Sequence, residues 1–148
     1  MSSTPQPPRK LLQERFSSQT GELKRIRTLV REAATTCGCS DDEIDCVVLA
    51  VNEACMNIIQ HAYGHAPDGE IILEILNNQH ELVFRLRDFG VKVDPCSVRS
   101  RDLEDIRPGG LGVHLMSQVM DAVEFLPPPD GTGNLLELRK TITAKRTD

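Results

Sequence analysis

The chain has 148 residues and a mass of 16.4 kDa, a size at which we expect one compact domain around a single core. Its formal net charge of -5 and pI of about 5.4 argue against nucleic acid or an anionic membrane as the main partner. No apolar run approaches the ~20 residues of a membrane-spanning helix. With no Trp, one Tyr and four Phe, the core is expected to be aliphatic.

Cysteine usage points to a reducing compartment. The five cysteines form an odd set without a CxxC motif, and no signal peptide is visible at the polar start of the chain. We therefore expect reduced thiols and a cytoplasmic protein. Cys37 and Cys39 could form a metal site or a strained redox pair, although no second ligand pair has suitable spacing.

The first part of the chain predicts a strand followed by a helix. Residues 1–9 are rich in Ser and Pro and are expected to be a disordered lead-in. Residues 10–16 predict a first strand, and the apolar spacing over 21–34 predicts a helix. Thr20 is the expected N-cap of that helix, which should end at Cys37-Gly38.

The clearest element is a second helix over residues 40–63. Ser40 followed three residues later by Glu43 is the pattern of a capping box. Eight apolar residues then keep the helical period and predict one buried stripe: Ile44, Val47, Val48, Val51, Cys55, Ile58, Ile59 and Ala62.

Three polar residues step along the outer flank of this helix. Glu53 lies nearly opposite the apolar stripe, and Asn57 and His61 follow it at steps of four. The amide oxygen of Asn57 suits Mg²⁺, a hard ion that prefers oxygen ligands. Glu53, one turn earlier, is placed to accept a proton from a hydroxyl group or water. Taken alone, the row also fits a solvated helix face. A zinc site at His61 and His65 lacks a third ligand, which favours a supporting or capping role for His61.

Two strands over 71–76 and 81–88 are predicted to form a hairpin through residues 77–80. Asp88 falls at the end of the second strand, where its carboxylate can accept a hydrogen bond from the amine of a base. Gly90 has no side chain and lets the backbone approach a flat ring. An ordinary turn after the strand is the alternative.

Residues 91–108 predict a long irregular loop, which in so small a domain is often a lid. Lys92, Arg99, Arg101 and Arg107 lie along it, interspersed with acidic residues. Of these cations, Arg107 stands nearest to the next glycine cluster, so we favour it as a phosphate ligand.

The glycines Gly109, Gly110 and Gly112 run into a helix predicted over 111–120. Glycines before a helix N-terminus free backbone N–H groups to meet phosphate oxygens, and the helix dipole favours the negative charge. The sequence therefore predicts a phosphate site here.

Two last strands are predicted over 122–126 and 135–141. Between them, Thr132 or Asn134 is a candidate nucleotide contact, with a plain hairpin turn as the alternative. The grouping of strands and helices predicts an α+β fold: a two-layer sandwich with a mixed, mostly antiparallel sheet and helices on one face. We expect residues 10–143 to form this single domain.

At these residues the chain resembles the ATP-binding domain shared by sensor histidine kinases, DNA gyrase B, MutL proteins and the heat-shock-ninety chaperones. It looks most like the stand-alone anti-sigma factor serine kinases of bacteria. The resemblance implies a histidine-kinase-like ATPase domain that binds ATP with Mg²⁺. The chain departs from the family at two places. The family often has a second glycine where Lys92 stands here. It also usually has a threonine directly beside the last strand, and Thr132 lies slightly before that position.

The resemblance also implies roles for individual residues. Glu53 would be the general base, and Asn57 the Mg²⁺ ligand with His61 beside it. Asp88 would bind the adenine amino group beside Gly90, while Gly110 and Gly112 would cradle the phosphates.

Family members bind a sigma factor, phosphorylate a serine on a small antagonist protein, and commonly form homodimers. This implies a serine-protein kinase. The rival is a nucleotide-gated binding module, an anti-sigma factor without significant phosphotransfer. An interaction protein with a vestigial pocket and an ATPase that only hydrolyses ATP are further alternatives.

Overall fold

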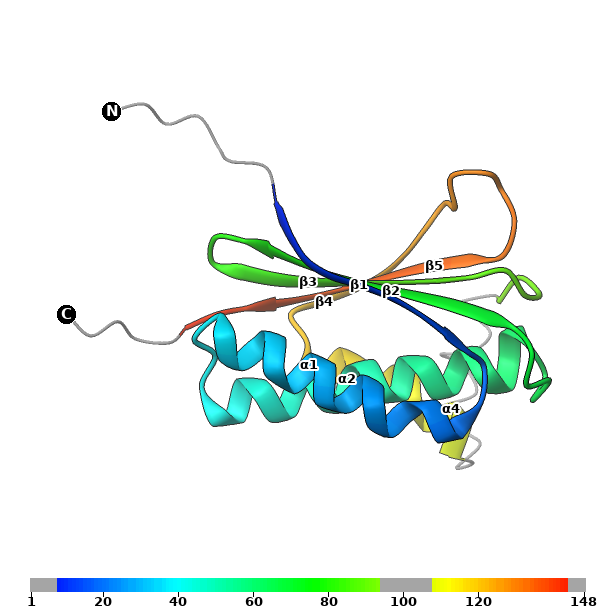
Figure 1. Cartoon of the computed structure of the whole chain (residues 1–148), viewed down its shortest axis with the longest axis horizontal. Coiled ribbons are helices and arrows are strands. Elements are labelled where there is room, and N and C mark those ends of the chain that lie inside the picture. Colours follow the sequence, from blue (N-terminus) through cyan, green and yellow to red (C-terminus); the bar gives the residue numbers. More distant parts are fainter. Residues whose placement is uncertain (1–7, 94–107, 144–148) are drawn as a thin grey trace.

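The protein, described here by a computed structural model, is a two-layer α+β sandwich (Figure 1). The structure describes residues 8–93 and 108–143, with side chains from His114 onward in the second range. A five-stranded sheet runs in the order β1-β2-β3-β5-β4, and every pairing is antiparallel. This confirms the predicted sandwich. The strands are β1 (Arg9–Ser17), β2 (Glu70–Asn78), β3 (Glu81–Asp88), β4 (Ala122–Leu126) and β5 (Asn134–Thr141).

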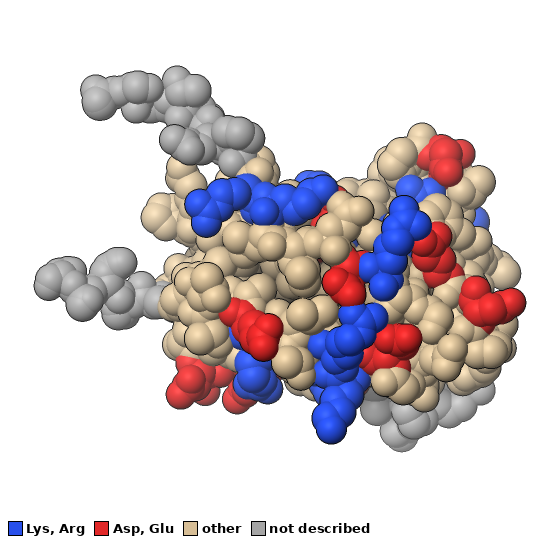
Figure 2. Space-filling view, viewed as in Figure 1, with Lys and Arg blue, Asp and Glu red and all other residues tan. Residues whose placement is uncertain are grey.

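The helices that the structure describes all lie on one face of the sheet, as predicted (Figure 1). They are α1 (Leu23–Thr36), α2 (Asp41–Asn57), its continuation η2 (Ile58–Ala62) and α4 (Pro108–Val119), with a short 3₁₀ turn η1 (Thr20–Glu22) before α1. Among the described residues, no helix is long and apolar enough to cross a membrane. On the face seen in Figure 2, the basic and acidic side chains drawn are interspersed.

The prediction that Thr20 caps the first helix is wrong. Thr20 begins the 3₁₀ turn, and α1 follows from Glu22 without a side-chain cap. The N–H of Glu22 bonds to the carbonyl of Gln19, 3.0 Å away, so the tighter turn satisfies a donor that a cap would otherwise serve.

The capping box of α2 is confirmed. The Ser40 hydroxyl accepts from the Glu43 N–H at 3.1 Å, and the Glu43 carboxylate accepts from the Ser40 N–H at 2.8 Å. The other Glu43 oxygen accepts from the Thr143 N–H at 2.8 Å, so the buried glutamate also anchors the chain after β5. All eight residues of the predicted apolar stripe are buried.

The last turn before Tyr63 departs from the predicted α-helix. Residues 58–62 form a π-helix, in which the Tyr63 N–H reaches back five residues to the carbonyl of Ile58 at 3.1 Å. Such wide turns are rare and occur often at functional sites. The apolar period continues through the segment and gives no sign of the change.

Strand β3 places the expected face against the helices. Leu82, Phe84 and Leu86 are fully buried, and Asp88 ends the strand on the same face. On the opposite face, which carries no helix among the described residues, Arg85 and Arg139 both pair with the buried Glu137.

The last helix begins three residues before its predicted start at residue 111, so the prediction that Gly109 and Gly110 precede the helix is wrong. Helix α4 begins at Pro108, so Gly109, Gly110 and Gly112 lie inside it. Proline is favoured at a first helical position because its fixed φ angle suits the helix and its missing N–H is not needed there. Most of the predicted lid, with Arg99, Arg101 and Arg107, lies outside the described residues.

Candidate active site

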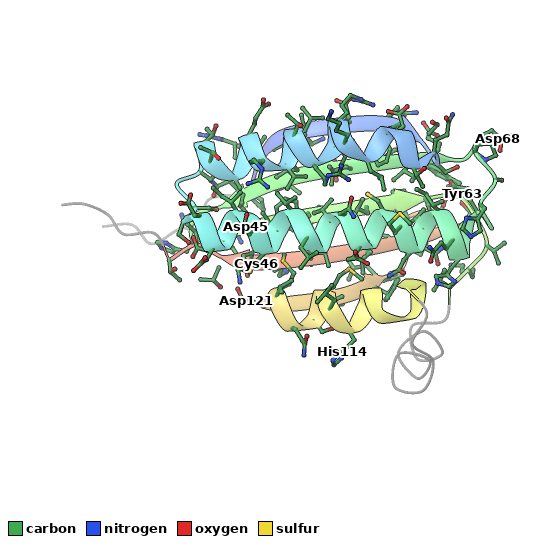
Figure 3. The ribbon with its side chains drawn as sticks, turned by 90° about the horizontal axis from the view of Figure 1, so that it is seen from below. Asp45, Cys46, Tyr63, Asp68, His114 and Asp121 are labelled. Carbon is green, nitrogen blue, oxygen red and sulfur yellow. The ribbon has the colours of Figure 1, made fainter. Side chains whose placement is uncertain are left out.

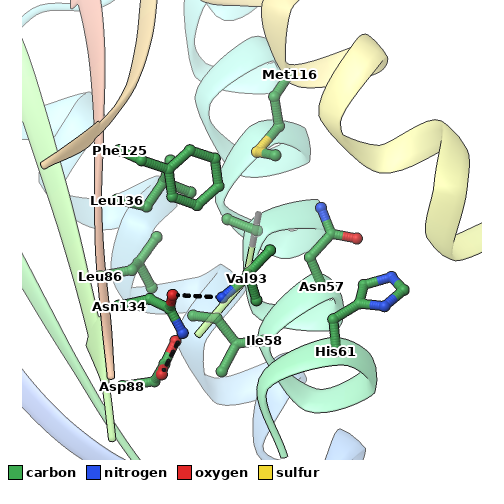
Figure 4. Close-up of a pocket in the computed structure, with 11 residues that line it drawn as sticks. Asn57, Ile58, His61, Leu86, Asp88, Val93, Met116, Phe125, Asn134 and Leu136 are labelled. Atoms are coloured by element: carbon green, nitrogen blue, oxygen red, sulfur yellow. Dashed lines mark hydrogen bonds between the residues drawn. The ribbon is translucent and has the colours of Figure 1, made fainter. Parts of the chain in front are cut away.

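A pocket lies between the helix α2–η2 and the ends of strands β3 and β5 (Figure 4). Asn57 and His61 line it from the helix, and Asp88 and Asn134 line it from the sheet. The structure thus brings together four residues named as candidates from the sequence, two from one helix and one from each of two distant strands. The remaining lining residues are apolar: Ala54, Ile58, Leu86, Val93, Met116, Phe125 and Leu136.

Asp88 is a buried carboxylate with one oxygen engaged and one oxygen open. It is 1% exposed, and its Oδ1 accepts from the Gly90 N–H and from the Asn134 amide, each at 3.0 Å. Oδ2 receives no side-chain hydrogen bond from the residues that the structure describes, although the backbone N–H of Asn134 also lies close enough to the carboxylate to lower its pKa. Burial raises the pKa of Asp88, and the hydrogen bonds from Asn134 and Gly90 oppose that rise. The free oxygen can therefore accept from a donor on a ligand.

Asn134 is the residue that holds this end of the pocket together. Its amide nitrogen donates to Asp88 and, at 2.9 Å, to the carbonyl of Val91. Its amide oxygen accepts from the Val93 N–H at 2.8 Å. The sequence marked Asn134 only as an alternative to Thr132. Its place opposite Asp88 follows from the β3–β5 register, which local sequence does not reveal.

The structure does not bring Thr132 to the pocket. Its hydroxyl donates to Asp130 at 2.8 Å, and its carbonyl accepts from Arg87 at 3.2 Å. Hydrogen bonds from Thr132 come first among the causes that lower the pKa of Asp130 to about 2. Thr132 therefore shapes the turn between β4 and β5.

Two glycines allow the backbone to pass close to Asp88. A Cβ at Gly133, where φ is +68°, would lie 2.0 Å from the carbonyl oxygen of Asp88. A Cβ at Gly90 would lie 2.3 Å from the carbonyl oxygen of Ala62. That same carbonyl accepts from the Val91 N–H at 2.8 Å. Gly90 is thus needed for packing against η2, a reason the sequence did not suggest.

The helix side of the pocket carries an unsatisfied amide. Both polar atoms of the Asn57 side chain are buried and have no hydrogen-bond partner among the residues that the structure describes. A buried amide without partners costs free energy, and such groups often mark a ligand site. An amide oxygen also fits Mg²⁺, which is usually held by one or two protein oxygens together with waters and substrate phosphates. No group of three or more His, Cys, Asp and Glu placed to hold a metal occurs in the described part of the chain.

Glu53 stands one turn before Asn57 on the same helix and is half-buried. It does not line the pocket. Burial raises its pKa, which makes the carboxylate a stronger base than an exposed glutamate.

The phosphate-binding residues expected from sequence are located only in part. Gly110 and Gly112 lie in α4, which packs beside α2 and contributes Met116 to the pocket wall (Figure 3). Arg107 lies outside the described residues.

Comparisons with known proteins agree with this arrangement. The sequence profile of the family described as "Histidine kinase-like ATPase domain" matches residues 16–140. The serine-protein kinase RsbW of Bacillus subtilis is 30% identical over 132 residues, which cover 83% of this chain and 80% of that protein. RsbW of Halalkalibacterium halodurans is 27% identical over 131 residues, with 83% and 78% covered.

A solved structure shares the fold. The RsbU and RsbW domains of a Mycobacterium tuberculosis protein superpose with a TM-score of 0.62 at 15% identity, covering 97% of this chain and 35% of that one. ATP is the nucleotide that these family relationships imply. The chain belongs to the histidine kinase-like ATPase domain family and, within it, to the family of the RsbW serine-protein kinases.

Proposed function

We propose that this chain is an ATP-dependent serine-protein kinase and anti-sigma factor that phosphorylates a small antagonist protein. The observation that carries the proposal is the pocket itself. One wall offers an open carboxylate oxygen on Asp88, and the other offers the unsatisfied amide of Asn57. The first wall can accept a hydrogen bond from a nucleotide base, and the second can bind the metal ion that accompanies a phosphate chain. The names of the relatives support the kinase activity.

Asp88 is the proposed ligand of the adenine amino group. Its Oδ1 is held by Gly90 and Asn134, so the orientation of the carboxylate is set before a nucleotide arrives. The amino group would donate to Oδ2. A base that presents an acceptor at this position would leave the buried carboxylate unpaired, and this mismatch would discriminate against it.

Asn57 is the proposed Mg²⁺ ligand, with His61 beside it in the pocket. When bound, the ion would neutralise charge on the phosphates. We further propose that Gly110, Gly112 and Arg107 contact those phosphates, on the basis of the resemblance to the family. Phosphoryl transfer depends mainly on positioning and on charge stabilisation, and these residues would serve both needs.

Glu53 is the proposed general base. Its carboxylate would accept the proton of the antagonist's serine hydroxyl as the serine oxygen bonds to the γ-phosphorus and the bond to ADP breaks. The raised pKa of Glu53 makes it better suited to hold that proton than an ordinary surface glutamate.

The partners are proposed from the family relationship. They are a sigma factor, the antagonist that carries the serine, and a second copy of the chain in a homodimer. Sedimentation equilibrium of the purified protein tests the dimer, and a monomer at all concentrations would contradict it.

Phosphate transfer from γ-labelled ATP to proteins that co-purify with the chain tests the proposed activity. We expect a labelled serine on one small partner, and Glu53→Gln should abolish the labelling while ATP binding remains. Asp45→Asn is the matched control, because Asp45 lies on the same helix with its side chain 71% exposed. Labelling that survives in Glu53→Gln would contradict the role of Glu53. ATP and partner binding without any labelling would favour the rival function, a nucleotide-gated binding module.

A further inference from the structure

Tyr63, the single tyrosine of the chain, links the end of η2 to the start of β2 and to the segment that follows β3. It follows the π-helix η2, and its hydroxyl donates to the carbonyl of Glu70 at 2.6 Å. The same hydroxyl accepts from the Phe89 N–H at 2.7 Å. We call this hydroxyl with its two backbone partners the Tyr63 bridge. Figure 3 shows Tyr63 at the end of the long helix, on the side of the neighbouring strand ends.

The Tyr63 bridge stands where the β2–β3 ladder would continue. The last pair of that ladder is Ile71 and Asp88, so the next pair in register would be Glu70 and Phe89. The hydroxyl lies between the backbone groups of these two residues and bonds to both. Strand β3 therefore ends at Asp88, although its partner strand extends one residue further.

Beyond the bridge, the chain no longer pairs with β2 and is held by η2 and by the side chain of Asn134 at the start of β5. The Val91 N–H donates to the carbonyl of Ala62 in η2, and the Gly90 N–H turns back to the carboxylate of Asp88. The backbone path of Phe89 and Gly90 thus sets the position of the Gly90 N–H, one of the two donors to Asp88. Because η2 directly follows Asn57, the bridge also ties the two walls of the pocket to each other.

The surroundings of the ring keep the bridge in place. A Cβ at Gly69 would lie 2.6 Å from the tyrosine ring, so the loop before β2 packs closely on it. Burial is the main cause that raises the pKa of Tyr63, so at neutral pH the hydroxyl keeps the proton that it donates to Glu70.

We propose that Tyr63 is a positioning residue for nucleotide recognition: its hydroxyl fixes the Phe89–Val91 path and so aims the Asp88 carboxylate at the amino group of the base. This inference rests on the proposed function. Tyr63 touches neither nucleotide nor metal in this role and acts only through the segment that follows β3.

The test is Tyr63→Phe, which removes the hydroxyl and keeps the ring. We expect ATP to bind roughly tenfold more weakly by calorimetry, the scale of one lost hydrogen bond. For a nucleoside triphosphate whose purine lacks the amino group, the same substitution should weaken binding much less, because that nucleotide makes no bond to Asp88. In phosphorylation assays the KM for ATP should rise while kcat changes little. A purely structural role would not change the ratio between the two nucleotides.

Ser18→Ala is the matched control. Ser18 is buried and ties the same loop, donating to the carbonyl of Ala66 at 2.6 Å and accepting from the Gly69 N–H at 2.9 Å. These hydrogen bonds go to the loop before β2 and not to Phe89, so the control should lower the melting temperature and leave the ratio between the two nucleotides unchanged. If Tyr63→Phe does not fold, Gly69→Ala crowds the ring and should show the same selective loss.

The outcomes separate the inference from the proposed function. Wild-type affinity in Tyr63→Phe, or an equal loss for both nucleotides, would overturn the positioning role while ATP binding by the unmodified protein stands. If the unmodified protein binds no ATP, the proposed function fails, and the positioning role fails with it.

Discussion

The two walls of the pocket differ in how far their polar groups are already satisfied. On the sheet wall, Asn134 uses both ends of its amide, and Asp88 has one oxygen held by two donors. On the helix wall, the amide of Asn57 is buried, and neither of its polar atoms bonds to any part of the chain that the structure describes. Two asparagines in one pocket thus stand in opposite states.

This difference shows which wall already has the arrangement that its ligand requires. The sheet wall is pre-organised, so little ordering remains when a base binds there. The helix wall carries a free-energy cost in the free protein that a ligand would relieve. Ligand binding should therefore stabilise the protein mainly through the helix wall. The following substitutions test the contrast from the largest expected effect to the smallest, and a control variant directly follows the change that it matches.

Asp88→Asn should prevent recognition of the base while keeping the hydrogen bonds that hold the sheet wall together. The new amide oxygen can still accept from Gly90 and Asn134, but an N–H₂ group replaces the open oxygen and faces the amino group of the base. We expect ATP affinity to fall by on the order of a hundredfold, as for sites built around one hydrogen bond. Calorimetry measures the loss, and affinity within a fewfold of wild type would refute the assignment.

Gly133→Ala should damage the sheet wall itself. The position combines φ of +68° with a Cβ only 2.0 Å from the Asp88 carbonyl oxygen. We expect a loss of about 3 kcal/mol in the free energy of unfolding, from backbone strain and overpacking together. Urea denaturation measures it.

Gly131→Ala is the control for that glycine. Its φ is +76°, but a Cβ there meets nothing within 4 Å. Only the strain remains, and we expect about 1 kcal/mol. Equal losses in the two variants would show that the close approach to Asp88 does not matter.

The two asparagines should respond in opposite directions to the same change. Asn134→Ala removes three hydrogen bonds and leaves buried partners unpaired, which should cost about 2 kcal/mol of unfolding free energy. Asn57→Ala removes an amide that has no partners, so stability without ligand should stay equal or rise by up to about 1 kcal/mol. Thermal and urea unfolding of the pair measure both. A clear loss of stability in Asn57→Ala would contradict the contrast.

The smallest expected effect is a dependence on pH. The pKa of Asp88 is raised in the folded protein, chiefly by burial, so the folded state holds this proton more tightly than the unfolded state. Stability from this group is present below the unfolded pKa and is lost as pH rises through the folded value. The difference in melting temperature, Asp88→Asn minus wild type, should therefore become more positive as pH rises from acid to neutral. A difference that stays constant with pH would contradict it.

Local sequence predicted the parts of the pocket that a single element determines. The helical period identified the buried face of α2, and the same period placed Asn57 and His61 together on its flank. Asp88 could be found because it ends a strand with clear alternation. A spacing rule suffices wherever one helix or strand fixes which residues face the same way.

The rest depends on contacts between distant segments. The role of Asn134 comes from strand register, and that of Tyr63 comes from a hydroxyl between two strand ends. The π-helix keeps the apolar pattern of an α-helix, so no period reveals it. Glycines usually argue against helix, and local propensity alone therefore put Gly110 outside α4.

Calorimetric titration of ATP, with and without Mg²⁺, tests most directly whether the two walls hold one nucleotide. We predict binding to the unmodified protein that is strengthened by Mg²⁺. Asn57→Ala should keep weak binding but lose the effect of Mg²⁺, whereas Asp88→Asn should lose binding under both conditions. No binding to the unmodified protein, or an undiminished effect of Mg²⁺ in Asn57→Ala, would contradict the account.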